Sequence, residues 1–131
     1  MMKASAIAMR SIPGDIFNNL QHLESHLMEA ANKEVDLCIF PELNLSGTFA
    51  TREEVDEFLK QNSDPISTCR HLSEKYHIAF TSGWPVVEHD RFYIAQFLFE
   101  KGEMVGFHKK THLAGKEVQI FTPADQIDVF R

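Results

Sequence analysis

Glu42 is the first residue whose type and position could support catalysis. It follows an uninterrupted apolar run over residues 37–40 and then Pro41, a pattern that predicts a buried strand ending at the proline. Open α/β sheets usually place their chemistry at the carboxyl ends of such strands. Desolvation there raises the pKa of a carboxylate and suits it to act as a general base. The alternative is a strand-end glutamate that only reaches water.

A second group of candidate residues lies between positions 106 and 125, directly after another predicted strand. It contains the adjacent cations Lys109 and Lys110, with Glu117 a few positions later. A lysine held near a carboxylate at a strand end could donate hydrogen bonds to a developing oxyanion. The alternative is that the two lysines form a solvated charge pair.

Neither the two cysteines nor the seven histidines add a second type of site. Cys38 precedes Glu42 by four positions on the same predicted strand, which places the two residues about 13 Å apart, too far for a thiol–base hydrogen bond of about 3 Å. Cys69 lies on the apolar stripe of a predicted helix, so we expect both thiols to be reduced core residues. His22 and His26 share a helix face but have no evident third ligand, so we expect no metal.

The elements that must position these residues begin as a β-α-β unit. Residues 4–9 predict a strand, and residues 16 to about 33 predict an amphipathic helix with Asp15 as its N-cap. The buried strand at residues 36–40 follows. Two more helices begin at recognisable caps, the first at Thr51 in a capping box and the second at Asp64 before a proline.

The second half of the chain predicts antiparallel strands. Residues 78–82 form a strand candidate that Gly83 should stop. Residues 91–99 and 103–107 are joined by a tight turn and predict a hairpin. Residues 126–130 alternate like the start of another strand. A β-α-β start followed by a hairpin predicts an α/β fold with a mixed sheet.

Length and charge narrow the possible partners. At 131 residues the chain is one domain at most, or part of a larger one. Its net charge of −6 argues against nucleic acid and anionic membranes as partners. The sequence has neither a signal peptide nor an apolar run long enough for a bilayer, and with reduced cysteines this predicts a cytoplasmic protein.

Taken together, these motifs resemble the nitrilase superfamily of carbon–nitrogen hydrolases. Its first signature is similar to residues 13–15, 19–20, 40–42 and 46–47, and its second to residues 110–113, 117 and 121–123. The likeness covers residues 1–131 in the family's order. It departs from the family pattern at Lys109, where arginine is usual, at Ile94, where asparagine is frequent, and at Ala124, where glycine is usual.

The resemblance implies an α-β-β-α sandwich, truncated here after about half of the domain, and a Glu-Lys-Cys triad. Glu42 matches the general base, Lys110 matches the lysine that stabilises the tetrahedral intermediate, and Glu117 matches a second glutamate that positions the lysine. The nucleophilic cysteine belongs to a third motif, which residues 1–131 do not contain. The implied substrate is a small amide or nitrile, and the implied chemistry needs no cofactor.

Two other interpretations remain open at this stage. The chain could be a catalytically inactive, truncated homologue that acts as a binding or oligomerisation module, because half a sandwich leaves a sheet edge and apolar surface unpaired. For this reason we expect a homo-oligomer. The chain could also be an unrelated α/β domain, in which case Glu42 and Lys110 would lie far apart. The resemblance predicts that their side chains lie within a few Å.

Overall fold

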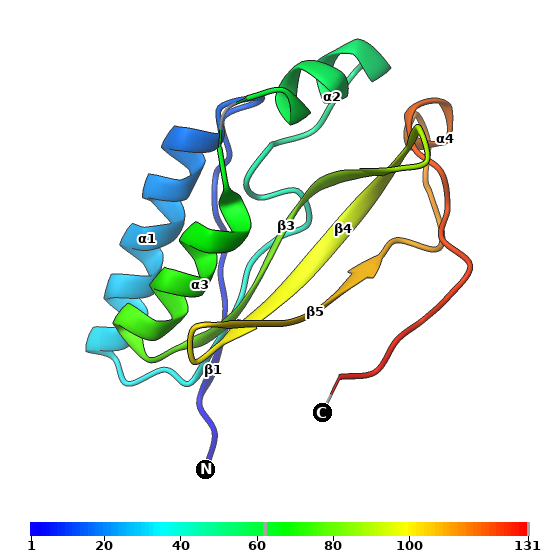
Figure 1. The fold of residues 1–131 in the computed structure, drawn as a ribbon. Coiled ribbons are helices and arrows are strands. Elements are labelled where there is room, and N and C mark those ends of the chain that lie inside the picture. The colour runs from blue at the N-terminus through cyan, green and yellow to red at the C-terminus, as the bar shows by residue number, and fades with distance from the viewer. Residues whose placement is uncertain (62, 131) are drawn as a thin grey trace.

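A single mixed sheet runs through the molecule (Figure 1). The structure is a computed structural model that describes residues 1–61 and 63–130. Its five strands lie in sequence order, with the first three parallel and the last two antiparallel. They are β1 (Ala4–Ala6), β2 (Leu37–Ile39), β3 (Ala79–Glu88), β4 (Arg91–Glu100) and β5 (Glu103–Lys109). The predicted α/β fold with a mixed sheet is therefore confirmed.

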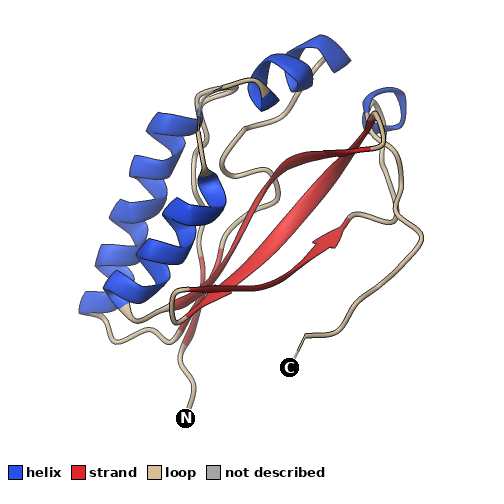
Figure 2. Cartoon of the chain, in the orientation of Figure 1, coloured by secondary structure: helices blue, strands red, loops and turns tan. Residues whose placement is uncertain are grey.

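Two long helices cover one face of this sheet (Figure 2). These are α1 (Ile16–Asn32) and α3 (Pro65–Tyr76), while the shorter α2 (Arg52–Leu59) and α4 (Glu117–Ile120) lie near one end of the sheet. The predicted N-caps of the first three helices are confirmed. The side chains of Asp15, Thr51 and Asp64 each accept a hydrogen bond from the backbone N–H three residues later.

The two faces of the sheet have different surroundings. Phe97 and Phe99 of β4 pack in a core with Leu23 and Leu27 of α1. Because side chains alternate along a strand, the residues between and before them point the other way. We call this side the distal face, defined by Gln96, Leu98, His108 and Ile39, which the strand register places on the same side.

The end of the third strand was predicted wrongly. β3 does not stop at Gly83 but continues to Glu88, and Gly83 pairs with Gln96 of β4. A Cβ atom at Gly83 would lie 2.3 Å from Gln96 Oε1 and 3.0 Å from the Leu43 nitrogen. This glycine is therefore a point of close approach inside a strand rather than a strand terminator.

Two further strand predictions need correction. The first strand covers only residues 4–6 rather than 4–9, and residues 126–130 form no strand. The C-terminal segment instead runs along the side of the sheet away from α1 and α3 (Figure 1), and the Phe130 ring lies against Gly106 of β5. An alternating pattern needs a neighbouring strand to form a ladder, and no described strand pairs with this segment.

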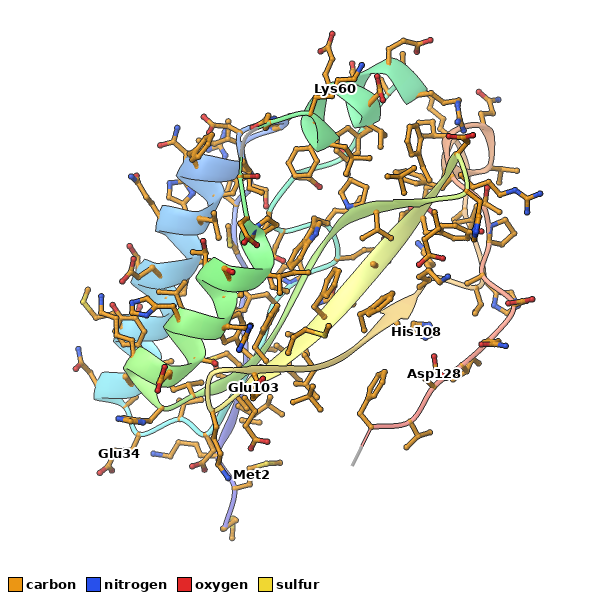
Figure 3. All side chains as sticks on the ribbon, in the orientation of Figure 1. Met2, Glu34, Lys60, Glu103, His108 and Asp128 are labelled. Atoms are coloured by element: carbon orange, nitrogen blue, oxygen red, sulfur yellow. The ribbon has the colours of Figure 1, made fainter. Side chains whose placement is uncertain are left out.

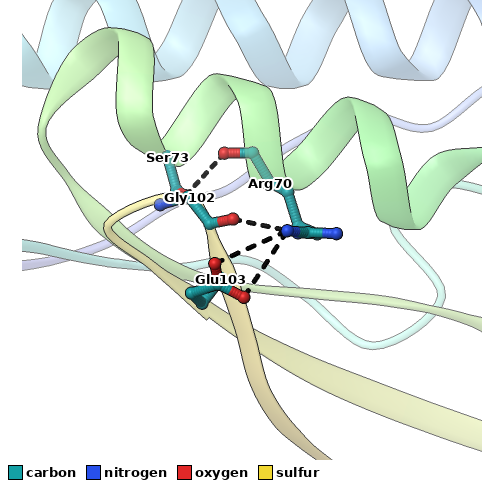
Figure 4. Close-up of polar contacts among 4 residues, drawn as sticks. All are labelled: Arg70, Ser73, Gly102 and Glu103. Carbon is teal, nitrogen blue, oxygen red and sulfur yellow. Dashed lines mark hydrogen bonds and ion pairs between the residues drawn. The ribbon is translucent and has the colours of Figure 1, made fainter.

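The predicted turn between β4 and β5 is hydrogen-bonded to helix α3 (Figure 4). Lys101 and Gly102 both have positive φ, as the tightest hairpin turns require. The Gly102 N–H donates to Ser73 Oγ at 2.9 Å, and Arg70 Nε donates to the Gly102 carbonyl at 2.9 Å. Arg70 also pairs with Glu103 at 3.5 Å. These bonds fix where β5 begins.

No helix in the described chain combines the length and apolar content needed to cross a membrane.

Candidate active site

The two lysines at the end of β5 point to opposite sides of the sheet. Lys109 Nζ bonds to Glu88 at 2.8 Å and lies 4.5 Å from the centre of the Tyr93 ring. Lys110 continues the ladder, since its N–H donates to the Ile94 carbonyl at 2.8 Å. Each ammonium has its own carboxylate partner, so the alternative of a solvated lysine pair is wrong.

Glu42 and Lys110 meet although they lie 68 positions apart in the sequence. Lys110 Nζ donates to Glu42 Oε1 at 3.1 Å. The far separation expected of an unrelated fold is therefore contradicted. The desolvation expected for Glu42 is not seen, because 47% of its side chain is exposed.

Glu117 is the second carboxylate bound to Lys110. Lys110 Nζ lies 3.2 Å from Glu117 Oε1 and 3.0 Å from Oε2, and Oε2 also accepts the Ala114 N–H at 3.0 Å. Helix α4, which begins with Glu117, is tied to α2 because Arg52 donates to the Ile120 carbonyl at 2.9 Å. All three predicted site residues therefore converge on one ammonium group.

The electrostatics of this cluster keep Lys110 charged. Desolvation alone would lower the pKa of Lys110, but its hydrogen bonds to Glu117 and Glu42 outweigh that effect and raise its pKa. Burial opposes the ionisation of Glu117, yet hydrogen bonds from the Ala114 amide and the Lys110 ammonium hold its pKa below the ordinary value of 4.5. These pKa shifts favour a charged Lys110 and an ionised Glu117 at neutral pH. Lys110 is thus equipped to donate hydrogen bonds and not to accept a proton.

Both cysteines lie in the core, as predicted, and not beside this cluster. Cys38 and Cys69 are fully buried among the side chains between the sheet and the long helices. Desolvation raises the pKa of each thiol, which disfavours the reactive thiolate.

A pocket of about 220 Å³ opens beside the cluster. Besides Glu42 and Lys110 it is lined by Gln96, His108, Thr111 and His112. Figure 3 shows His108 on the side of β5 that faces the C-terminal segment.

Sequence analysis did not select Gln96, and it included His108 in the second candidate stretch without giving it a role. The signal that could have identified them is their alternation with Phe97 and Phe107 on paired strands, which turns both toward the distal face. Among residues 1–61 and 63–130, no group of three or more His, Cys, Asp or Glu side chains could hold a metal ion.

Comparison with known proteins decides the family. Residues 3–131 match the family described as carbon-nitrogen hydrolase. The chain belongs to the carbon–nitrogen hydrolase family. No curated protein sequence matches it.

Solved structures of an amidase and of an NAD(+) synthetase share its fold. The chain is similar to the NitN amidase from Nesterenkonia sp. AN1, with 23% identity and a TM-score of 0.79 over 96% of this chain and 51% of the amidase. A variant of that amidase in complex with butyramide gives 22% identity and a TM-score of 0.77 over 95% of this chain and 49% of the amidase chain. A glutamine-dependent NAD(+) synthetase from Cytophaga hutchinsonii gives 23% identity and a TM-score of 0.77 over 95% of this chain and 22% of the synthetase chain. The chain therefore spans about half the length of the amidase structures.

Proposed function

We propose that this chain supplies the general base and the oxyanion-stabilising lysine of a carbon–nitrogen hydrolase site acting on a small amide or nitrile. The observation that carries the proposal is the Lys110 ammonium, held 3.1 Å from Glu42 and 3.0 Å from Glu117 beside an open pocket. In this assignment Glu42 and Lys110 touch the reacting atoms, and Glu117 positions Lys110.

The proposed reaction on an amide has two stages. First, Glu42 accepts the proton of a thiol, the sulfur attacks the carbonyl carbon, and Lys110 donates hydrogen bonds to the oxygen that becomes negative. The carbon–nitrogen bond then breaks, the leaving amine takes the proton from Glu42, and a thioester remains. In the second stage, Glu42 deprotonates a water that attacks the thioester, which releases the acid and regenerates the thiol.

The position of Glu117 supports its assigned part in this scheme. Its carboxylate contacts Lys110 through both oxygens and is itself fixed by the Ala114 amide. A lysine with two carboxylate partners is held in one place and stays protonated. This arrangement provides a donor oriented before the substrate arrives, which is the feature that oxyanion stabilisation needs.

An external thiol offers a direct test, because Cys38 and Cys69 are both buried away from the pocket. The purified chain is incubated with para-nitroacetanilide and mercaptoethanol, and release of para-nitroaniline is followed by absorbance. We expect the chain to accelerate thiolysis, and Glu42→Gln to reduce that acceleration by about tenfold or more, since a general base contributes at least this factor. Glu53→Gln, an exposed glutamate in the first turn of α2, is the matched control.

Two results would contradict the proposal. The first is thiolysis that proceeds equally well with Glu42→Gln. The second is turnover without added thiol that survives Cys38→Ser and Cys69→Ser but disappears with Glu42→Gln, which would mean that the chain provides another nucleophile.

A second candidate function is a binding or oligomerisation module without catalysis. It is favoured by Ile39, which lies on the distal face with 47% of its surface exposed, next to the exposed Ala6 of β1. Burying such a face is the usual way a half-covered sheet becomes stable. Sedimentation velocity tests this function. Association that increases with concentration and is reduced by Ile39→Lys would support it, and a monomer at all concentrations would exclude it.

A further inference from the structure

Gln96 is a polar pocket residue whose orientation is set by two hydrogen bonds. Its Nε2 donates to the Phe40 carbonyl at 3.1 Å and to Thr81 Oγ1 at 3.1 Å. A backbone carbonyl only accepts hydrogen bonds, so it fixes which end of the amide carries the nitrogen. The first bond joins Gln96 to the segment that leads into Glu42, and the second joins it to β3.

The other end of the same amide lies above Gly83. The absence of a side chain there makes room, because a Cβ atom at Gly83 would come within 2.3 Å of Gln96 Oε1. Among the described residues no donor bonds to this oxygen, yet no side-chain oxygen of the described chain is buried without a partner. Gln96 lines the pocket beside Lys110, and its Oε1 is the end of the amide that no described protein donor occupies.

Lys110 and Gln96 offer a ligand opposite kinds of hydrogen-bonding group. Lys110 presents only donors, whereas Gln96 Oε1 presents only an acceptor. A carboxamide matches both, because its oxygen accepts and its N–H donates. A nitrile has no N–H, and a carboxylate product would bring a second acceptor against Oε1. We propose that Gln96 is a specificity-determining residue that selects amides bearing an N–H over nitriles, N,N-disubstituted amides and carboxylate products.

This inference rests on the proposed function for the location of the pocket, and it narrows the substrate to one chemical class. The volume of about 220 Å³ is below the usual range for drug-sized ligands, which favours a short acyl chain. The selectivity comes from the cost of leaving Gln96 Oε1 without a hydrogen-bond donor. A ligand that has no N–H displaces water from this oxygen and forms no hydrogen bond to it, so its binding is weaker.

The test compares four molecules that share a three-carbon chain and differ in the functional group at one end. Propionamide, propionitrile, N,N-dimethylpropionamide and propionate are titrated into the 15N-labelled chain, and shifts of the Gln96 side-chain amide and of residues around Lys110 are followed by NMR. We expect propionamide to bind about fivefold more tightly than the nitrile and the dimethyl amide, the ratio given by one hydrogen bond. Gln96→Met keeps the length but removes the acceptor and should abolish the preference. Gln21→Met, an exposed glutamine on α1, should retain it.

Every outcome bears on the inference. Equal binding of the amides and the nitrile, or a preference that persists in a folded Gln96→Met variant, overturns it and leaves the roles of Glu42 and Lys110 untouched. Failure of all four molecules to bind also overturns it, while thiolysis dependent on Glu42 would still support the proposed function. If Gln96→Met does not fold, the comparison among the four ligands on the unaltered chain decides the question.

Discussion

Replacing Glu117 by glutamine tests whether the Lys110 cluster stabilises the chain as its geometry indicates. The variant keeps an oxygen that can accept the Ala114 N–H and changes only the charge facing Lys110. Both side chains are about one-quarter exposed, at 26% and 27%, so solvent screens their interaction only in part. A hydrogen bond to a charged partner is worth about 1 kcal/mol more than a neutral one, and we expect the free energy of unfolding to fall by about that amount.

Urea denaturation measures this change through Trp84, the only tryptophan, which is 5% exposed and stacked on Phe97. A loss of about 1 kcal/mol moves the midpoint by roughly 0.5 M urea for a chain of this size. The matched control is Glu103→Gln, which removes an exposed partner of Arg70 at 3.5 Å and should leave the midpoint nearly unchanged.

The stability contributed by Glu117 should depend on pH in a defined direction. Because the folded chain lowers the pKa of Glu117, its contribution is present above the ordinary value of 4.5 and is lost as the pH falls through the lower folded value. The difference between the unaltered chain and Glu117→Gln should therefore be full at pH 7 and shrink in acid. An equal difference at all pH values, or none at pH 7, would refute the reasoning.

Three further predictions concern the core and the strands. Gly83→Ala should lower the free energy of unfolding by about 2 kcal/mol in thermal or urea denaturation, because the new methyl group overlaps Gln96 Oε1; an unchanged midpoint would show that the strands can separate. Asn19→Leu should cost about 3 kcal/mol, since this fully buried amide bonds to both polar groups of the Ile12 backbone and to the Leu45 carbonyl, and a loss below about 1 kcal/mol would contradict that count of bonds. Cys38 and Cys69 should react with a disulfide reagent only as fast as the chain unfolds, because burial raises the pKa of both thiols; rapid labelling of the native chain would disprove their burial.

The convergence of Glu42, Lys110 and Glu117 could be predicted because each residue matches a motif of the carbon–nitrogen hydrolases, and the resemblance implies that the three side chains meet. It did not allow the two ends of β3 to be predicted equally well. A glycine in a strand pattern can end the strand or make room for a bulky side chain on the neighbouring strand. Which of the two occurs depends on the residue paired with the glycine. At Gly83 that neighbour is Gln96, which lies on a different strand.

The same limit explains why Gln96 itself was missed. Its local context is an ordinary alternating strand, and its side chain is oriented by bonds to Phe40, directly after β2, and to Thr81 of β3. Residues 126–130 show the reverse error, because their residue types alternate but no described strand pairs with them in a ladder. Local pattern predicts which elements form, whereas pairing decides where they end and what they face.

The doubled lysine at the end of β5 makes this site tolerant of a slip in strand register. The hydrogen bonds of Arg70 and Ser73 to Gly102 set where β5 starts. A shift of one residue later in β5 would turn every following side chain to the opposite face of the sheet. In a chain with one extra residue in β5, Lys109 would take the place of Lys110 and still bring an ammonium to Glu42. An insertion here would thus remove the Lys109–Glu88 pair and keep an ammonium beside Glu42, whereas a deletion would leave the carboxylates facing Thr111.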